Sequence, residues 1–343
     1  MELNARKREI LAAIIKTYME TGEPVGSKLL CGILGNRLSP ATLRNEMSDL
    51  CALGYLEQPH TSAGRAPTKE GYRFYLKKLM PATPPDRNTI QRIDRLLDGM
   101  PTEPDRVLGE AAARLSDFTG LPAVAALLPN ERATVTAARI LQTGRVNRFL
   151  AVVMTSDGQH GVRTVEAIWP PGEMEIEKID RILAAGLSGK TVGELTPLLL
   201  QHMIAADGNG LLFAPLIGAV FELAADLTRA RCGGGGATRV YDFSELAGRA
   251  RGLLELLSDP VRMIDLLSGS TAPVSVLFGE ESGVDALRPA VLVIAGFRLG
   301  GARIGRLGVV GPTRMNYSYL VPSVEYFAKG LGAKLSSALE TEA

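Results

Sequence analysis

The segment SPATLRNEMSDLCALG, which begins at Ser39, holds the side chains that are best suited to reading a base sequence. Arg44 can bond a guanine and Asn45 an adenine, each through a pair of hydrogen bonds. Small neighbours would let a helix carrying them approach the base edges of a major groove: Ala41, Thr42 and Ser48. The alternative is an ordinary surface helix that carries one arginine and one asparagine.

The same segment has clear signals for a helix. Ser39 can act as the N-cap and Pro40 as the first helical residue, where the missing amide hydrogen of proline costs nothing. Leu43, Met47 and Leu50 fall within about 60° of one another around a helix. We therefore predict that these three side chains are buried and that the polar face opposite them meets solvent.

Two further helices are expected before this segment. The first begins after an Asn4 cap and ends at Gly22, and the second, shorter helix runs from a Ser27 cap to about Leu34. Together with the segment from Ser39 they make a helical triplet, as in a helix-turn-helix domain.

A hairpin is expected after the triplet. Residues 55–57 favour a strand, and the loop PHTSAGRAPT that follows carries Arg65 near its tip. Thr68 can then cap a helix over 69–79. A helical triplet followed by a hairpin with a basic tip predicts a winged helix-turn-helix DNA-binding domain over residues 1–80.

The charge of the chain is divided unevenly between its parts. The first 80 residues hold 12 basic and 8 acidic residues, or +4, whereas the rest hold 26 basic and 29 acidic, or −3. Five basic residues follow the predicted reading helix: Arg65, Lys69, Arg73, Lys77 and Lys78. Such cations can position a protein on phosphates without reading sequence. A basic face that meets only solvent is the alternative.

Length and composition predict a globular protein of two or three domains without enzymatic activity. The chain has 343 residues, of which 46% are hydrophobic and 22% charged. Its cysteines and histidines lie too far apart for a disulfide framework, a metal site or acid–base catalysis: Cys31, Cys51, Cys232, His60, His160 and His202. We expect no cofactor, no metal and no catalytic residue.

No targeting or membrane segment is expected. The start, MELNARKREI, lacks the apolar core of a secretory signal. The longest run of apolar, Gly and Pro residues, 211–221, is shorter than the roughly 18 residues that a spanning helix needs. These features predict a soluble cytoplasmic protein.

Two glycine patterns resemble nucleotide-binding motifs but lack their context. AAGLSGKT at 184–191 has alanine where a phosphate-binding loop begins with glycine, and a helical pattern precedes it instead of a strand. Gly305, Gly308 and Gly311 recur every third residue with no βαβ unit after them. Bends or close backbone packing explain this second pattern better.

Beyond residue 80 the sequence predicts a linker and an interrupted domain. Residues 81–104 hold five of the 20 prolines, and a short helix is expected there around Ile90, Ile93 and Leu97. Strands are expected at 139–142, 148–155, 163–169, 274–279, 290–297 and 304–310, and helices at 108–118, 176–187, 191–206, 246–257, 261–267 and 317–339.

This order of strands, helices and strands again predicts an α+β multidomain fold. Residues 105–170 and 271–343 form one domain in two segments, and the mostly helical residues 171–270 are inserted into it. The four consecutive glycines at 233–236 predict a mobile loop or turn.

Four segments carry a resemblance to a known family: GSKLL at 26–30, SPATLRNEM at 39–47, LGYLEQPHTSAGRAPTKEGYRFY at 53–75 and GPTRMNYSYLVPSVEYFA at 311–328. They closely resemble the bacterial heat-inducible transcription repressors of the HrcA family. The resemblance implies a winged-helix N-terminus and a GAF-like domain interrupted by an inserted dimerising domain. It also implies repression of chaperone operons of the groE and dnaK type through the inverted-repeat operator CIRCE, release on heat stress, and modulation by the GroE chaperonin. Leu43, where isoleucine is expected, and Cys51, where glutamate is common, are mild departures.

We expect the DNA contacts to come from the predicted reading helix, the start of the helix before it and the wing. The residues are Ser27, Lys28, Ser39, Ala41, Thr42, Arg44, Asn45, Ser48, His60, Thr61, Ser62 and Arg65. The expected partner is double-stranded DNA bound by a homodimer, because an inverted repeat presents two half-sites to a two-fold protein.

Two questions stay open at this point. A metabolite-responsive winged-helix repressor, with a small molecule sensed in the GAF-like domain, is the alternative function. Arg314 and Asn316 in GPTRMNY suit either a domain contact or polar site, or a cap between a strand and a helix.

Overall fold

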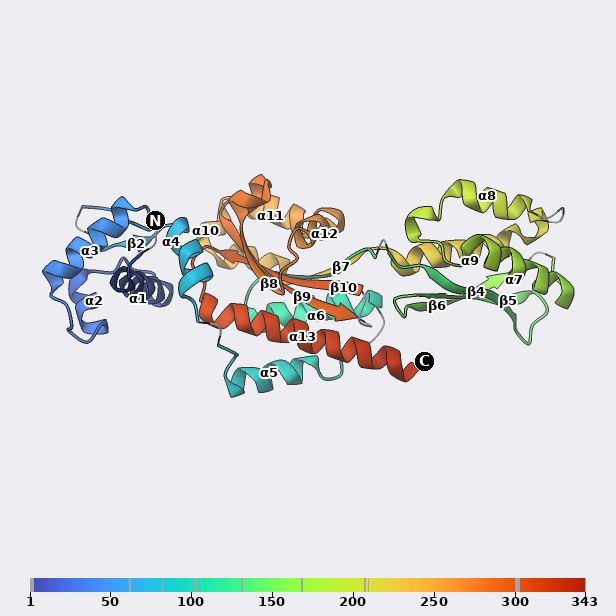
Figure 1. Cartoon of the computed structure of the whole chain (residues 1–343), viewed down its shortest axis with the longest axis horizontal. Helices are drawn as coiled ribbons and strands as arrows, with labels where there is room; N and C mark the ends of the chain where they lie inside the picture. Colours follow the sequence, from blue (N-terminus) through green and yellow to red (C-terminus); the bar gives the residue numbers. More distant parts are fainter. Residues whose placement is uncertain are drawn as a thin grey trace.

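The computed structural model describes residues 3–61, 63–81, 83–101, 104–130, 132–167, 169–206, 208, 210–299 and 303–342. They form three units in a row (Figure 1). A winged helix lies at one end, a five-stranded sheet with helices lies in the middle, and a three-stranded sheet with helices lies at the other end. The middle unit and the last unit are together called the body.

The first unit has the predicted winged-helix order. Its elements are α1 (Ala5–Thr21), α2 (Ser27–Ile33), α3 (Pro40–Ala52), β1 (Leu56–Glu57), β2 (Ala66–Pro67), α4 (Lys69–Phe74) and the π-helical turn η1 (Tyr75–Leu79). Asn4 caps α1 by accepting a hydrogen bond from the Lys7 amide at 2.8 Å, and Gly22 ends it in the left-handed conformation. The N-cap of α2 is Gly26, not the predicted Ser27, which is already helical.

The predicted stripe of α3 is the core of this unit. Leu43, Met47 and Leu50 are buried, as predicted. They join Ile10 and Ile14 of α1 in one hydrophobic cluster. α1 therefore supports α3 from behind, and the opposite face of α3 stays exposed.

The predicted linker helix is α5 (Arg87–Leu97). Asp86 caps it by accepting hydrogen bonds from the amides of Asn88 and Thr89, and these bonds, with one from the Thr89 hydroxyl, lower the pKa of the Asp86 carboxyl. Ile93 and Leu97 are buried. The helix packs along α13 (Tyr317–Glu342), so the linker lies on the surface of the body.

The middle unit is an antiparallel sheet with helices on both faces. The strand order is β7 (Arg231–Gly235), β3 (Ala123–Leu127), β10 (Arg303–Pro312), β9 (Ala290–Leu299) and β8 (Val274–Phe278). α6 (Pro104–Thr119) and α13 cover one face, and α10 (Ser244–Ala247), α11 (Ala250–Leu257) and α12 (Pro260–Ser268) cover the other. Short 3-10 turns connect them: η3 (Ala237–Asp242), η4 (Gly279–Ser282) and η5 (Asp285–Leu287). Alternate residues of β9 point into the two cores, as expected for a strand buried on both sides.

The prediction of a mobile loop at the four glycines is wrong. Gly233, Gly234 and Gly235 lie in β7, which pairs with β3. A Cβ on Gly233 would lie 2.4 Å from the Gly109 amide nitrogen, and a Cβ on Gly235 would lie 2.4 Å from that of Ala113. The glycines are therefore needed where α6 rests directly on the strand, a role that their lack of side chains had hidden.

The last unit has its own sheet and core. β4 (Val135–Gln142), β5 (Arg148–Thr155) and β6 (His160–Glu166) form an antiparallel meander. α7 (Glu173–Leu187), the turn η2 (Val192–Glu194), α8 (Pro197–Ala205) and α9 (Gly210–Thr228) accompany it, and the buried residues of the helices and strands form one cluster.

The boundaries of the insertion therefore need correction. Strands β4 to β6, which the sequence assigned to the first segment of the interrupted domain, pack with α7 to α9. In contrast, β7 and helices α10 to α12, which the sequence assigned to the insertion, pack on the five-stranded sheet. Local periodicity does not show which strands pair with one another, so the order of strands and helices in the sequence did not reveal this exchange.

The apolar segment near residue 211 forms a longer helix than its uninterrupted run indicated. In the described part of the chain, α9 is the helix that is long and apolar enough to span a membrane, over Gly210–Leu227 with a mean hydropathy of 1.7. Its residues Phe213, Ile217 and Val220 are buried in the core of the last unit. The arrangement is that of a core helix.

The repeated glycines of β10 reflect close packing, as predicted. A Cβ on Gly305 would lie 2.1 Å from the ring of Phe297, and one on Gly311 would lie 2.3 Å from the sulfur of Met315. The segment 184–191 begins within the last turn of α7, so a helix and not a strand leads into its glycine turn. The glycines of the second segment lie within β10 and not in a loop between a strand and a helix, so this segment does not form a nucleotide-binding loop either.

Candidate nucleic-acid interface

The outer face of α3 is exposed and begins at a well-formed cap. The Ser39 hydroxyl accepts a hydrogen bond from the Thr42 amide at 3.1 Å and also lies 2.9 Å from the Thr42 hydroxyl. Ser39 and Thr42 are therefore held together at the start of the helix. The next turns present the remaining predicted residues to solvent: Ala41, Arg44, Asn45 and Ser48.

The acidic residues of α3 lie on the side that meets α1. The Lys7 ammonium lies 2.8 Å from a carboxylate oxygen of Glu46 and 2.8 Å from one of Asp49. Hydrogen bonds to Asp49 and then to Glu46 raise the pKa of Lys7. Arg6 also lies 3.5 Å from Glu46, so the two cations of α1 tie α3 to α1 and offset the charge of its two carboxylates.

The wing is shaped by a residue that the sequence reasoning missed. The Gln58 side-chain amide donates hydrogen bonds to the backbone oxygens of Thr61, at 2.9 Å, and Ala63, at 3.2 Å. The Ala63 amide donates to the His60 oxygen at 2.8 Å. These bonds close the turn that carries His60 and Thr61. A polar side chain directly after a strand was the available signal.

The wing is fastened to the segment before α2. Val25 and Arg65 exchange two backbone hydrogen bonds of 2.9 Å. Gly64 allows this approach, because a Cβ there would lie 2.4 Å from the carbonyl carbon and oxygen of Val25. The Arg65 side chain is thereby brought beside the start of α2.

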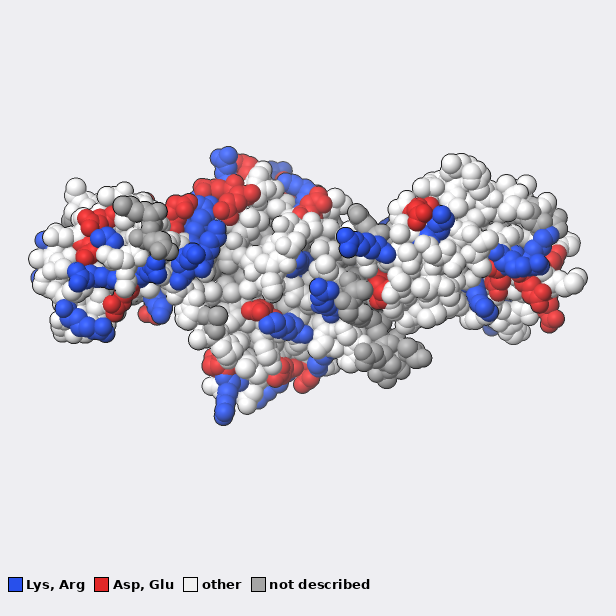
Figure 2. All heavy atoms as spheres, viewed as in Figure 1, with Lys and Arg blue, Asp and Glu red and all other residues white. Residues whose placement is uncertain are grey.

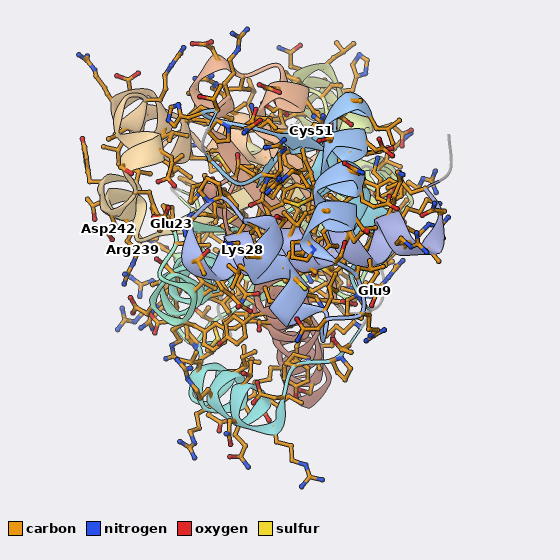
Figure 3. The ribbon with its side chains drawn as sticks, turned by 90° about the vertical axis from the view of Figure 1, so that its left-hand side faces the viewer. Glu9, Glu23, Lys28, Cys51, Arg239 and Asp242 are labelled. Atoms are coloured by element: carbon orange, nitrogen blue, oxygen red, sulfur yellow. The ribbon has the colours of Figure 1, made fainter. Side chains whose placement is uncertain are left out.

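A cleft of about 430 Å³ joins α2, α3 and the wing. Its lining includes five of the predicted contact residues, Ser27, Lys28, Arg44, Thr61 and Arg65, together with Gln58. In the view from the end of the molecule, Lys28 lies at the front of the winged helix, turned away from the body (Figure 3). Among the residues that the structure describes, the lining includes three cations and no carboxylate, so the cleft suits an anionic ligand such as a phosphate backbone.

The other predicted residues lie outside this cleft. Ala41, Asn45 and Ser48 lie on the exposed face of α3, and His60 lies on the exposed tip of the wing. Ser62 lies outside the described residues. The structure thus provides two adjoining regions, one formed by the cleft and one by the outer face of α3.

Two of the five basic residues expected to contact phosphates face the body. Lys69 pairs with Glu280, and Arg73 Nε lies 2.9 Å from a carboxylate oxygen of Glu281. Lys77 and Lys78 are exposed. Some basic side chains of the winged helix are therefore paired with carboxylates of the body, and others meet solvent.

Arg314 and Asn316 have different roles, one as a domain contact and the other as a helix cap. The Arg314 guanidinium lies against Gly22 at the end of α1, where an added Cβ would be 2.8 Å from Nη1, so this residue makes a domain contact. The Asn316 side-chain oxygen accepts a hydrogen bond from the Tyr319 amide at 3.3 Å and caps α13.

Comparison with known proteins matches nearly the full length of the chain to one family. Residues 2–79 match the model of the winged helix-turn-helix transcription repressor, HrcA DNA-binding, and residues 105–321 match that of the HrcA protein C terminal domain. The heat-inducible transcription repressor HrcA of Moorella thermoacetica is 31% identical, covering 98% of each chain. The protein of the same name from Symbiobacterium thermophilum is 34% identical over 96% of this chain and 98% of its own.

A solved structure shares the fold. The crystal structure of a protein described as hypothetical has a TM-score of 0.62 and 24% identity to this chain, and it covers 98% of this chain and 99% of its own. The family models cover most of the chain and the relatives match it nearly from end to end. The chain therefore belongs to the HrcA family of heat-inducible transcription repressors.

Proposed function

We propose that this protein represses heat-shock chaperone operons by binding the inverted-repeat operator CIRCE as a dimer in the cytoplasm. The observation that carries the proposal is the exposed face of α3 beside a cleft whose described lining residues include three cations and no carboxylate. Heat-inducible transcription repressors of two other bacteria are similar to this chain over nearly its full length. No cofactor is part of this proposal.

In the proposed complex, α3 enters the major groove. Arg44 and Asn45 are exposed on the helix and have the donor and acceptor pattern that fits guanine and adenine. Ser27, Lys28 and Arg65 border the same cleft and reach the flanking phosphates, which fixes the register of the helix. Thr61 and His60 of the wing contact the backbone beyond the groove.

The proposed dimer forms through the three-stranded sheet. Helices α7 to α9 pack on one face of this sheet, and the opposite face carries an apolar band that spans all three strands. Its members are Leu141, Leu150, Val152, Met154 and Val162, and three of them are strongly exposed, at 46% for Leu141, 49% for Met154 and 58% for Val162. Burying this band against a second copy removes apolar surface from water.

Heat acts, in this proposal, on the dimer or on its folding. The last unit, which is the inserted part of the chain, has a hydrophobic core separate from those of the five-stranded sheet and the winged helix. It can therefore lose structure while they stay folded. Loss of the dimer removes the gain in affinity that comes from binding two half-sites at once. The GroE chaperonin then returns the protein to its competent state when it is free of other clients.

Footprinting upstream of the chaperonin operon tests the proposal. We expect protection of an inverted repeat at the growth temperature, with weaker protection at a heat-shock temperature and recovery on addition of chaperonin. Equal affinity at both temperatures, with and without chaperonin, would contradict the thermal part. Absence of a protected inverted repeat would contradict the operator itself.

A further inference from the structure

The winged helix is docked on the middle unit through an apolar centre. The ring of Tyr72 in α4 meets the ring of Tyr317 at the start of α13 edge to face, with 5.8 Å between their centroids. The Tyr75 hydroxyl lies 2.8 Å from the hydroxyl of Ser318. All three tyrosine rings are buried. The boundary between the two units is therefore a packed interface and not a flexible joint.

Charged pairs border this centre on one side. Lys69 pairs with Glu280, and Arg73 pairs with Glu281 at 2.9 Å. The Arg73 guanidinium also lies over the ring of Phe278, 4.9 Å from its centroid, in cation–π geometry. Figure 2 shows basic and acidic side chains gathered side by side where the winged helix meets the middle unit.

A second contact lies on a different helix. The Arg314 guanidinium lies against Gly22, which ends α1. A cation there is favoured by the negative end of the helix dipole. Because α1 and α4 are both held, the winged helix is fixed against rotation about either contact.

Packing across the boundary is incomplete on the side of η1. A cavity of about 300 Å³ lies there, bordered by Leu76 and Met80 of the winged helix and by Val276 and Val321 of the middle unit. Apolar contacts alone do not fill this side of the boundary. The charged pairs and Arg314 must therefore help to hold the winged helix in a fixed orientation on the middle unit.

The held helices connect directly to the reading helix. Lys7 of α1 pairs with Glu46 and Asp49 of α3, and α1 and α3 share a core. An orientation imposed on α1 and α4 is therefore passed to α3. The orientation of α3 relative to the body is therefore set by the docking contact, which is the set of contacts between the winged helix and the middle unit described above.

We propose that Glu280, Glu281 and Arg314 are positioning residues that set the spacing between the half-sites this protein accepts. The inference rests on the proposed dimeric binding of an inverted repeat. In such a dimer the two α3 helices have a fixed separation only if each winged helix is rigidly held on its body. Winged helices tethered only by the segment after η1 would accept many spacings, because a flexible tether broadens the distances it can span.

The test compares operator spacing in the full-length protein. The variants are the double substitution Glu280→Gln with Glu281→Gln, and separately Arg314→Ala. The control is Glu255→Gln, which removes the carboxylate paired with Arg251 on α11, away from the boundary. Affinity is measured on inverted repeats whose central spacer is shortened or lengthened stepwise, and on a single half-site.

We expect the wild type and the control to show a sharp spacing optimum. For each positioning variant, the ratio of the affinity at the optimal spacing to the affinity at other spacings should fall about tenfold. Affinity for a single half-site should be unchanged. A charge exchange, Lys69→Glu with Glu280→Lys, should restore the optimum that Lys69→Glu alone removes. The unchanged half-site affinity shows that α3 is still folded and exposed.

The outcomes separate this inference from the function on which it rests. Variants that keep the wild-type spacing profile, including those that lose affinity equally for every DNA, would overturn the inference and leave the operator proposal standing. A wild-type protein that binds no inverted repeat would overturn the operator proposal and the inference with it.

Discussion

The rings of Tyr72 and Tyr317 meet edge to face with their centroids 5.8 Å apart, although one belongs to TKEGYRFY and the other to GPTRMNY. These two segments, from opposite ends of the chain, both carry the family resemblance. Their resemblance therefore marks one interface between the winged helix and the body. The ring contact gives Tyr72 and Tyr317 a structural role in docking, separate from any contact with DNA.

The two hydroxyls of this pair have different surroundings. Among the described residues, the buried Tyr72 hydroxyl has no hydrogen-bond partner, whereas the Tyr317 hydroxyl donates to the Thr313 oxygen at 2.7 Å. Burial raises the pKa of both hydroxyls, so both stay protonated near neutral pH. Tyr72→Phe should therefore be neutral or stabilising by up to about 1 kcal/mol, and Tyr317→Phe should cost about 0.5–1.5 kcal/mol. Thermal and urea unfolding measure both, and a clear loss for Tyr72→Phe would mean that an ordered water satisfies the hydroxyl.

Arg44 and Lys77 should affect DNA binding in different ways. Arg44→Ala removes a proposed bidentate base contact, so operator affinity should fall by about 1–3 kcal/mol and discrimination at one base pair should relax. Lys77 is exposed on η1, and Lys77→Ala should weaken binding to all DNA about equally and lower the salt dependence. Titrations on operator and scrambled DNA at several salt concentrations distinguish them. A neutral Arg44→Ala would place the reading face elsewhere.

The glycines of β7 offer a matched test of the close contact with α6. A Cβ on Gly233 would lie 2.4 Å from the Gly109 amide nitrogen, whereas the nearest atom to a Cβ on Gly234 is the Leu257 oxygen at 3.8 Å. Gly233→Ala should destabilise by about 1–3 kcal/mol through overpacking. Gly234→Ala should be neutral or slightly stabilising, because it restricts the unfolded chain without a clash. Equal melting temperatures for the two variants would show that α6 can move away from the strand at little cost.

Elements with strong local signals could be predicted from the sequence. Asn4, Ser39 and Thr68 each cap the helix that their position indicated. The burial of Leu43, Met47 and Leu50 followed from helical periodicity alone. The outer face of α3 could be identified for the same reason, since the side opposite a buried stripe must be exposed.

Elements defined by what packs on them could not be predicted. The five residues of β3, AVAAL, are buried on both sides, and β7 is mostly glycine, so neither strand has an alternating pattern. α9 is apolar around most of its surface and contains Pro215, which obscures its helical period. In the site, the bridge between Val25 and Arg65 and the pairing of Lys69 with Glu280 join distant segments, which no local spacing records.

The proposed dimer interface predicts a difference between the two sides of the insertion. Val162 lies on the open face of the three-stranded sheet at 58% exposure, and Leu211 lies on the helical side at 85%. Val162→Asp should shift the protein to monomers, because it places a charge within the buried apolar band. Leu211→Asp is the matched control and should leave the dimer intact. Sedimentation velocity over a range of concentrations distinguishes them, and the reverse result would move the interface to the helices.

The docking contact should weaken in acid because it depends on an ionised Glu280. The hydrogen bond from Lys69, together with its charge, lowers the pKa of the Glu280 carboxyl. A carboxyl whose pKa is lowered in the folded protein contributes stability above its unfolded pKa, and this contribution disappears as the pH falls through the folded value. Glu280→Gln should therefore reduce the free energy of unfolding at neutral pH by the small amount of an exposed pair, about 0.2–1 kcal/mol, and lower the melting temperature accordingly. The variant and the wild type should converge only in acid, once the pH has fallen through the lowered pKa of the folded Glu280 carboxyl. Lys69→Met should behave in the same way, since it removes the partner that lowers the pKa. A difference between Glu280→Gln and the wild type that persists undiminished in acid would show that the carboxylate does not act through this pair.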